Sequence, residues 1–345
     1  MGPAPAARTR RQRPRLIVDC AGGDHGPGTL VPAALEFLPQ ADLLLVGDRS
    51  AIAPLAPADA ALQIIDQGAN ASVDQGIRAL LRGAQSTAQG ACLKLLRDGE
   101  GDVLISAADT GALLTLSRHC LGSLPGIDRP ALTKQLNGKH GAFWMADLGA
   151  NVRCTPAMLV QFAQMGVVAS RVFSRVVRPR VALLNIGTEA SKGLARLHRA
   201  AAALEVLPDS EYVGFVEGSA LFDNQADVVV SEGFVGNVAL KAIEGTAGMA
   251  RHLMQETMAG LAPWQRLLMF GLRGPFARLG AQLDSGRYNG APLLGLPQTV
   301  IKSHGAARQD AFANALQRGI DAVDAALPET LAHGLSAARA DTQQE

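Results

Sequence analysis

Aromatic residues and net charge are both scarce in this sequence. Phe, Trp and Tyr make up 4% of the 345 residues, and the formal net charge is +1. Proteins that bind nucleic acids need a basic surface, and those that hold single strands also use aromatic side chains for stacking. The sequence therefore predicts no nucleic-acid partner. Hydrophobic residues make up 48%, which suffices for the core of one large domain.

Cysteines are also few. Cys20, Cys92, Cys120 and Cys154 lie far apart and form neither a C-x-x-C pair nor a metal-type cluster with the seven histidines. We interpret them as reduced core cysteines of a cytoplasmic protein. Neither a metal nor a cofactor is expected.

Long apolar runs are missing as well. No window approaches the about 18 uninterrupted apolar residues that a membrane-spanning helix needs. The apolar run Leu16–Val18 is too short for the core of a signal peptide. We expect a disordered basic tail over residues 1–14, one domain over 15–330 and a flexible tail over 331–345.

Several common catalytic motifs are absent. The sequence has no Walker A loop, no H-E-x-x-H, no G-x-S-x-G and no G-x-G-x-x-G behind its first predicted strand. P-loop kinases, serine hydrolases and dinucleotide-binding dehydrogenases are therefore disfavoured.

What is present is an alternation of short β-branched runs with longer helical patterns. This alternation predicts an α/β fold whose mostly parallel sheet is covered on both faces. The expected strands are 16–20, 42–46, 62–66, 102–106, 143–146, 181–185, 212–215, 228–230 and 299–301. The expected helices include 27–38, 84–97, 156–165 and 235–258.

Glycine and polar residues gather after four of these strands, at 22–25, 109–111, 187–189 and 233–237. In open parallel sheets, ligands bind beyond the carboxyl ends of the strands, where helix N-termini favour anions. Turn geometry alone explains any single loop of this kind. Four together predict a phosphate site at the carboxyl edge of the sheet.

The segment 252–284 combines large apolar side chains such as Trp264, Leu268 and Phe276 with interspersed arginines. We expect a helical hairpin here. Its apolar face suits peripheral contact with a membrane, and equally a contact with a second subunit or its own core. Both interpretations stay open.

From Arg15 to Val323 the sequence resembles the PlsX family of phosphate acyltransferases. The segments that carry the resemblance, in family order, are 19–27, 105–113, 125–131, 147–152, 183–193, 227–241, 288–295 and 300–305. The resemblance implies a three-layer α/β/α fold related to phosphotransacetylases and to isocitrate and isopropylmalate dehydrogenases. It also implies a homodimer that associates peripherally with the inner face of the membrane.

The reaction that the resemblance implies moves a fatty acyl group from acyl carrier protein onto inorganic phosphate. The acyl phosphate then serves a glycerol-3-phosphate acyltransferase in phospholipid synthesis. Phosphate is itself the nucleophile, so the protein must bind it, aim it at the thioester and stabilise the oxyanion.

Three residues are the candidates for catalysis. Lys192, in a G-x-E-x-x-K-G segment, is expected to hold phosphate and the oxyanion, although an early helix lysine is often only solvated. Asn237 donates to the oxyanion or caps its helix. His25 protonates the leaving thiolate, binds phosphate or is structural. Further expected binding residues are Gly22, Gly23, Asp24, Asp109, Thr110, Gly111, Gly187, Glu189, Gly236, Lys241 and His304.

Two departures from the family pattern affect these loops. Asp109 stands where the family has asparagine, and two basic residues are missing at 83–84. A carboxylate facing phosphate weakens its binding. The alternative function is therefore a divergent paralogue with weak or lost catalysis, acting as a binding or membrane-associated partner in a specialised lipid or polyketide pathway.

Overall fold

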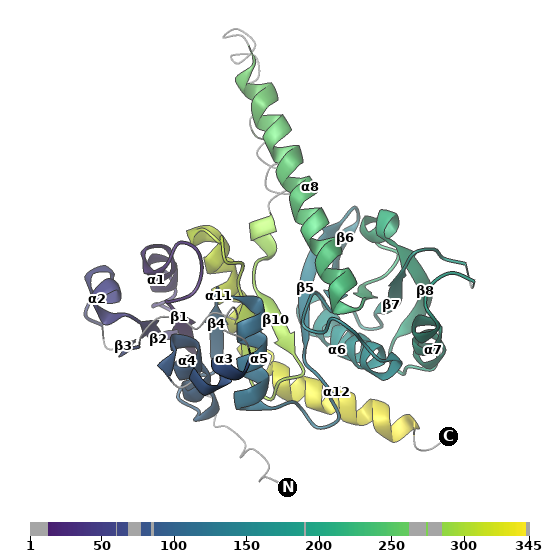
Figure 1. Ribbon diagram of the computed structural model, residues 1–345, viewed down its shortest axis with the longest axis horizontal. Helices are drawn as coiled ribbons and strands as arrows, with labels where there is room; N and C mark the ends of the chain where they lie inside the picture. Colours follow the sequence, from purple (N-terminus) through teal and green to yellow (C-terminus); the bar gives the residue numbers. More distant parts are fainter. Residues whose placement is uncertain are drawn as a thin grey trace.

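The computed structural model describes residues 13–59, 61–67, 77–83, 86–189, 191–261, 274 and 285–342. Within these residues one sheet has the strand order β3-β2-β1-β4-β11-β10-β5-β6-β9-β7-β8, with helices on both faces (Figure 1). The expected three-layer, mostly parallel α/β architecture is confirmed.

The first half of the sheet is entirely parallel. It consists of β1 (Arg15–Asp19), β2 (Asp42–Gly47), β3 (Leu62–Asp66), β4 (Val103–Ser106) and β11 (Thr299–Lys302). Aliphatic and β-branched residues dominate these strands because both of their faces are covered by helices. All five strands were predicted, with ends shifted by one residue at most.

The second half contains β6 (Gly141–Ala146), β7 (Arg180–Asn185), β8 (Glu211–Glu217) and β9 (Val228–Val230), which are also parallel to one another. Between the halves lie β10 (Ala291–Leu294) and β5 (Ala131–Gly138). The pairs β11–β10, β10–β5 and β5–β6 are all antiparallel. These three reversals make the strands of the second half run opposite to those of the first.

This reversal corrects one expectation. The carboxyl ends of β1 and β4 point one way along the sheet, and those of β7 and β9 point the other way. The four glycine loops therefore do not share one carboxyl edge. β10 and β5, which cause the reversal, were not predicted, because β10 is four residues long with a proline and β5 contains Lys134, Gln135 and Asn137.

Helices cover each face over its own hydrophobic core. One face carries α1 (Pro27–Leu35), α2 (Arg49–Ile52), α6 (Pro156–Ser174), α7 (Ala195–Leu204), α11 (Gln309–Asp324) and α12 (Leu327–Thr342). The other carries α3 (Ile77–Gly83), α4 (Ala88–Arg97), α5 (Thr110–Leu121) and α8 (Gly233–Ala259). Strand side chains alternate between the two cores: Leu16 and Val18 lie in one core, and Ile17 lies in the other.

Local capping sets several helix starts. Thr87 accepts a hydrogen bond from the Gly90 amide, so α4 begins at residue 88 rather than 84. Thr155 caps α6 in the same way. That helix continues past its predicted end because Gly166 packs closely against Val228 of the sheet instead of ending the helix.

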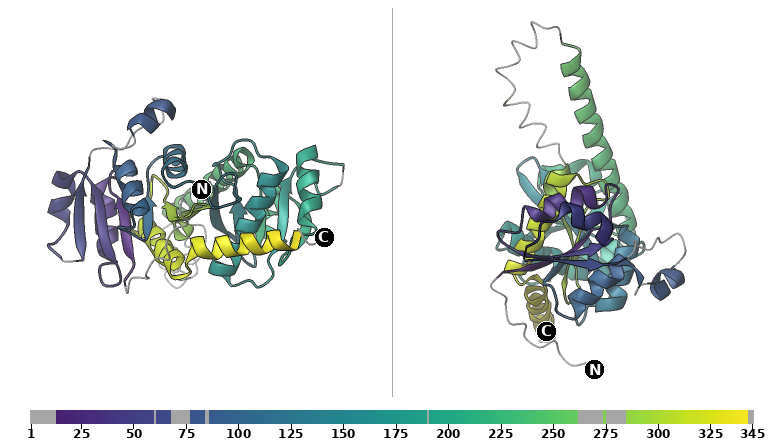
Figure 2. Two further views of the ribbon diagram at one scale, coloured as in Figure 1. Left: turned by 90° about the horizontal axis from the view of Figure 1, so that it is seen from below. Right: turned by 90° about the vertical axis from the view of Figure 1, so that its left-hand side faces the viewer.

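The C-terminal segment differs from the flexible tail that was expected. Residues 331–342 continue α12, and Leu331 and Leu335 are buried in the core beside α6. Figure 2 shows α12 as the yellow helix lying across the molecule. A short amphipathic repeat was mistaken for a tail because its apolar residues are few and widely spaced.

The segment 252–284 is described only in part. Residues 252–259 end α8, which projects from the body (Figure 1), with Met249 and Leu253 exposed along it. Trp264, Leu268 and Phe276 lie outside the described residues, as do residues 1–12 of the expected N-terminal tail. Among the described residues, α6 has the length and composition of a membrane-spanning helix, but it is mostly buried as a core helix.

Candidate functional site

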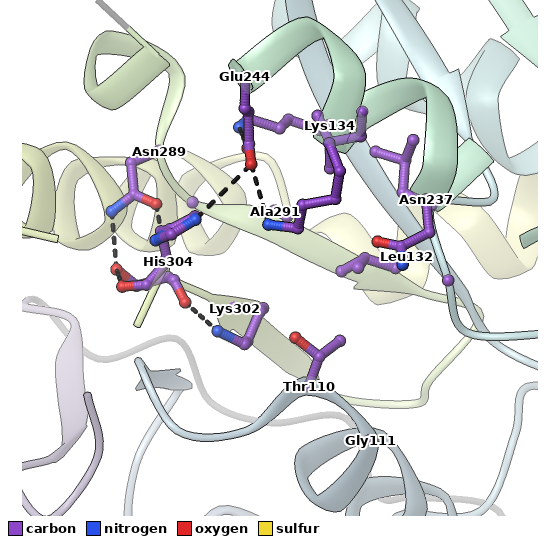
Figure 3. A pocket seen from close by; sticks show the side chains of 16 residues that line it. Thr110, Gly111, Leu132, Lys134, Asn237, Glu244, Asn289, Ala291, Lys302 and His304 are labelled. Atoms are coloured by element: carbon purple, nitrogen blue, oxygen red, sulfur yellow. Dashed lines mark hydrogen bonds and ion pairs between the residues drawn. The ribbon is translucent and has the colours of Figure 1, made fainter. Parts of the chain in front are cut away.

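A cavity of about 380 Å³ lies on the face of the sheet between α5 and α8, where the two halves meet (Figure 3). Its floor is formed by the middle strands β5, β10 and β11. Its lining comprises Thr110, Gly111, Leu132, Lys134, Leu148, Gly149, Asn237, Leu240, Lys241, Glu244, Asn289, Gly290, Ala291, Lys302, Ser303 and His304. The cavity therefore lies over the sheet rather than beyond one of its edges.

Two lysines stand on this floor in one row across the strands. Lys302 of β11 pairs with Ala291 of β10, and the register of β10 with β5 places Ala291 opposite Lys134. Residues opposite one another in a sheet point to the same face, and two strand spacings separate these lysines by about 10 Å. Both are only 8% exposed. Buried ammonium groups require anionic or hydrogen-bonding partners.

One carboxylate from α8 faces three of the cationic side chains. Glu244 accepts hydrogen bonds from Lys134 Nζ at 3.2 Å and Lys241 Nζ at 2.9 Å, and His304 Nε2 lies 3.7 Å away. Burial opposes ionisation of Glu244, but His304 and the two lysines outweigh it and lower the pKa of this carboxyl well below its usual range. Asn237, Lys241 and Glu244 share one face of α8 because they are four and three residues apart.

Lys302 has a different environment. Its Nζ donates to the carbonyl of Ser303, and within the described chain no carboxylate lies in ion-pairing distance of it. Burial lowers the pKa of Lys302 to about 8. The more distant negative charge of Asp109 opposes this shift, because it favours the protonated form. Among the lysines of the cavity, Lys302 is therefore the one without a paired anion in the part of the chain that the structure describes.

The N-terminus of α5 supplies the opposite wall. Thr110 and Gly111 are its first two residues, and the described chain offers no acceptor for their amides. The positive end of the helix dipole and these free amides favour an anion. Asp109 caps the helix by accepting from the Ala112 amide at 2.8 Å, and its side chain is exposed and does not line the cavity.

Asn289 fixes the loop that carries His304. Its amide donates to Ser303 Oγ at 2.7 Å and to the Ala311 carbonyl at 2.8 Å, and its oxygen accepts from the His304 amide at 2.9 Å. His304 Nδ1 accepts from the Ala306 amide at 3.1 Å. A neutral His304 therefore carries its proton on Nε2, the atom that faces Glu244.

Of the residues that the sequence proposed, the cavity brings together Thr110, Gly111, Asn237, Lys241 and His304. The first glycine loop lies elsewhere. Gly22 packs against Ala108, whose nitrogen would lie 2.7 Å from an added Cβ, and Gly23 has φ +78°. The Asp24 amide donates to Gly305, while the side chains of Asp24 and His25 are exposed.

The loop after β7 also lies outside the cavity lining. Lys192 is exposed, its amide donates to the Glu189 carbonyl, and its own carbonyl accepts from Asn185. Gly187 is covered by the Glu189 and Lys192 side chains, so this loop folds onto itself. A role for Lys192 in binding phosphate stays a prediction. Gly236 is buried against the backbone of Asp147 and acts through packing.

Among the cavity residues that sequence reasoning missed are Lys134, Glu244, Asn289 and Lys302. One signal was available, because Lys302 ends a buried apolar strand and a charged residue is rarely buried there. Among the described residues no group of three His, Cys, Asp or Glu side chains is placed to hold a metal ion. The cationic lining suits an anion.

The profile of the family described as "Fatty acid synthesis protein" matches residues 14–330. The chain belongs to this family. It is the PlsX family that the sequence motifs indicated.

Solved structures confirm the fold. A EutD phosphotransacetylase from Staphylococcus aureus has a TM-score of 0.57 at 14% identity, covering 91% of this chain and 94% of that chain. A phosphotransacetylase from Streptococcus pyogenes has a TM-score of 0.57 at 16% identity, covering 94% and 95%. A branched-chain phosphotransacylase from Enterococcus faecalis has a TM-score of 0.55 at 14% identity, covering 89% and 99%. This PlsX-family chain therefore has a phosphotransacetylase-like fold, and its family supports a role in acyl and phosphate transfer.

Proposed function

We propose that this chain is a phosphate acyltransferase that moves a fatty acyl group from a carrier-protein thioester to inorganic phosphate. The observation that carries the proposal is the cavity in which Lys134, Lys241 and Lys302 meet the N-terminus of α5. Structural neighbours of the same fold are named phosphotransacetylase and phosphotransacylase, which denotes acyl exchange with phosphate.

The charge of the cavity matches hydrogen phosphate. Three lysines and one glutamate leave a formal charge of +2 when His304 is neutral (3 − 1 = 2). Phosphate near pH 7 carries a charge between −1 and −2. We assign Lys302 and the amides of Thr110 and Gly111 as its main contacts, because these donors lack other anionic partners in the described chain.

The reaction needs little beyond orientation and charge. A phosphate oxygen attacks the thioester carbonyl, the carbonyl oxygen becomes an oxyanion, and the carrier leaves as a thiolate. The Asn237 side chain, exposed on the cavity wall one turn into α8, is the neutral donor assigned to that oxyanion. A thiolate leaves readily at neutral pH, so a dedicated proton donor contributes little.

The remaining assignments rest on the family alone. We propose acyl carrier protein as the donor, a glycerol-3-phosphate acyltransferase as the consumer of the acyl phosphate, and a cytoplasmic homodimer with peripheral membrane contact through 252–284. The described part of α8 supports such a contact only by projecting from the body with exposed apolar residues.

The test is an assay of purified protein with acyl-carrier thioester and phosphate. Free carrier thiol and hydroxylamine-trapped acyl phosphate are measured together. We expect Lys302→Ala to lower kcat/KM for phosphate by about a hundredfold, the scale of one lost charge-stabilising donor. Lys192→Ala, in an exposed lysine outside the cavity, is the comparison. A larger loss in Lys192→Ala than in Lys302→Ala would move phosphate to the loop after β7.

The pH dependence gives a second measure of Lys302. Its protonated form attracts phosphate, and its pKa is lowered to about 8, so phosphate affinity should fall as the pH rises through 8. Lys302→Arg keeps its charge and should remove this fall. Isothermal titration of the wild type and of the Lys302→Arg protein with phosphate, between pH 7 and about pH 9, measures both affinities.

Asp109 is the observation that favours the second function, a paralogue without catalysis. Phosphate binding without any phosphate-dependent release of carrier thiol, for every acyl chain length tried, would support that function instead.

A further inference from the structure

The three lysines of the cavity are not chemically equivalent. Lys134 and Lys241 donate to Glu244, and an ammonium held against a carboxylate has no lone pair to offer. Lys302 donates to a backbone carbonyl, and within the described residues no carboxylate is close enough to pair with it. Of these lysines, Lys302 is the one placed to become a free amine.

The surroundings of Lys302 also favour nucleophilic attack. It is 8% exposed on the floor of the cavity, between Ala291 on β10 and Ser106 on β4. The charged groups around Lys302 come from five other places: Asp19 on β1, Asp24 after β1, Asp109 before α5, Lys241 on α8 and Lys134 on β5. The three aspartates act on it through space from outside the cavity lining. Burial outweighs the three carboxylates, and the pKa of Lys302 falls to about 8. A desolvated lysine beside another cation is the usual activated form of this side chain.

We infer that Lys302 is a self-acylation site, whose amine accepts the acyl group of an acyl phosphate bound in the cavity. The Nζ lone pair attacks the carbonyl carbon, and the bond from that carbon to the phosphate oxygen breaks. Phosphate leaves with the electron pair and takes up the proton released from Nζ, which leaves an amide on Lys302. No oxidant, reductant or further reactant is consumed.

The neighbouring cations make the reaction specific. The amides of α5 hold the phosphoryl group, and the positive charges of Lys134 and Lys241 in the same cavity stabilise it as a leaving group. An acyl phosphate held in this way has its carbonyl carbon inside the same cavity as Lys302. The amide that forms is uncharged, so the site loses the cation that binds phosphate. Accumulated product would thus inactivate the protein that makes it, a consequence that rests on the proposed function.

The test uses acetyl phosphate, which needs no carrier protein and no turnover. Full-length protein is incubated with it at pH 8 and digested with a protease that does not cleave at lysine, and acetylation of each lysine is followed by mass spectrometry. At this pH about half of the Lys302 amine is neutral, whereas under about 1% of an ordinary lysine is neutral. The lower basicity of Lys302 makes its amine a weaker nucleophile, which offsets part of this gain in the reactive form. We expect Lys302 to react about tenfold faster than exposed Lys94 in the same sample.

Two further measurements decide the inference. Inorganic phosphate should slow acetylation of Lys302 at least fivefold and leave Lys94 unchanged, and phosphate binding should fall in step with the acetylated fraction. Equal rates at Lys302 and Lys94, or no protection by phosphate, would overturn the inference. The carrier-thioester assay is separate, so a protein without turnover that still acetylates at Lys302 would refute the proposed function alone.

Discussion

Lys134 and Lys302 are the residues on which the site depends. A buried ammonium without a partner costs several kcal/mol, so a fold retains it only where an anion or hydrogen bonds offset that cost. Lys134 forms an ion pair with Glu244, whereas within the described chain Lys302 donates only to a backbone carbonyl. Across the sheet from Lys302 lie Ser106 on β4 and then Asp19 on β1. Ser106 Oγ donates to Asp19 at 2.6 Å, which occupies that carboxylate. We therefore expect the proposed phosphate to lie beside Lys302.

A residue-scale prediction concerns Asp109, which stands where the family has asparagine. Its carboxylate lies outside the cavity but is the foremost charge acting on Lys302. We expect Asp109→Asn to tighten phosphate binding about threefold, because one negative charge near the anion is removed. The helix should keep its stability, since asparagine caps as well as aspartate. Calorimetric titration and thermal unfolding measure the two effects.

The matched control is Asp48→Asn. Asp48 caps α2 by the same kind of bond, to the Ser50 amide at 2.8 Å, and does not line the cavity. This variant should leave phosphate affinity unchanged. Equal affinities of the wild type and the Asp109→Asn protein would show that the α5 N-terminus takes no part in binding the anion.

At the scale of elements, the placement of α8 decides the site. Its first turn packs against the loop after β6, where buried Asp147 accepts from the Leu132, Ala150 and Asn151 amides at 2.9, 3.1 and 2.6 Å. Burial raises the pKa of Asp147 to about 6 despite these bonds. The loop thereby ties β5 to the start of α8, so that Asn237, Lys241 and Glu244 follow over the cavity in successive turns.

Gly236→Ala tests this placement. A Cβ at residue 236 would collide with the Asp147 carbonyl and lie 2.5 Å from Ser231 Oγ, so α8 must shift. We expect a loss of about 2 kcal/mol in the free energy of unfolding, together with weaker acyl transfer through the displaced Asn237. Urea unfolding and the thioester assay provide the measurements.

Gly248→Ala, on the same helix, is the control. Gly248 is exposed and a Cβ there meets nothing within 4 Å. This variant should gain about 0.5–1 kcal/mol from helix propensity and keep its activity. A Gly236→Ala protein as stable as the wild type would contradict the close packing of α8 on Asp147.

At the scale of the whole molecule, two oppositely directed half-sheets are held together by β10, β5 and the C-terminal helices. α11 packs on α1, β4 and β11 of the first half, while α12 packs on α6 of the second. The cavity lies over the strands that join the halves, so its geometry depends on how the two halves are fastened together.

Leu331→Ala tests this connection. Leu331 is 1% exposed in the core beside α6, and truncating a buried leucine costs about 3 kcal/mol. We expect that loss in the free energy of unfolding, measured with urea. His333→Ala, an exposed neighbour on α12, should change it by less than about 0.5 kcal/mol. Equal free energies of unfolding for the two variants would indicate that residues 331–345 form the flexible tail that the sequence predicted.

The sequence determined the elements that depend on local pattern. All nine predicted strands exist, because β-branched runs between glycine-rich turns reflect preferences within a few residues. The family motifs likewise led to Thr110, Gly111, Asn237, Lys241 and His304, which the structure brings to one cavity.

Only the tertiary structure decided which of these residues share a site. Strand direction depends on pairing between distant segments, and the short antiparallel β10 and β5 turned half of the sheet around. The pairing of β11 with β10 and of β10 with β5 set Lys302 and Lys134, residues far apart in the chain, in one row across the sheet. Lys192 and His25 lie outside the cavity lining. Neighbours across a sheet are chosen by register and burial of the whole fold, and no local pattern in the sequence encodes them.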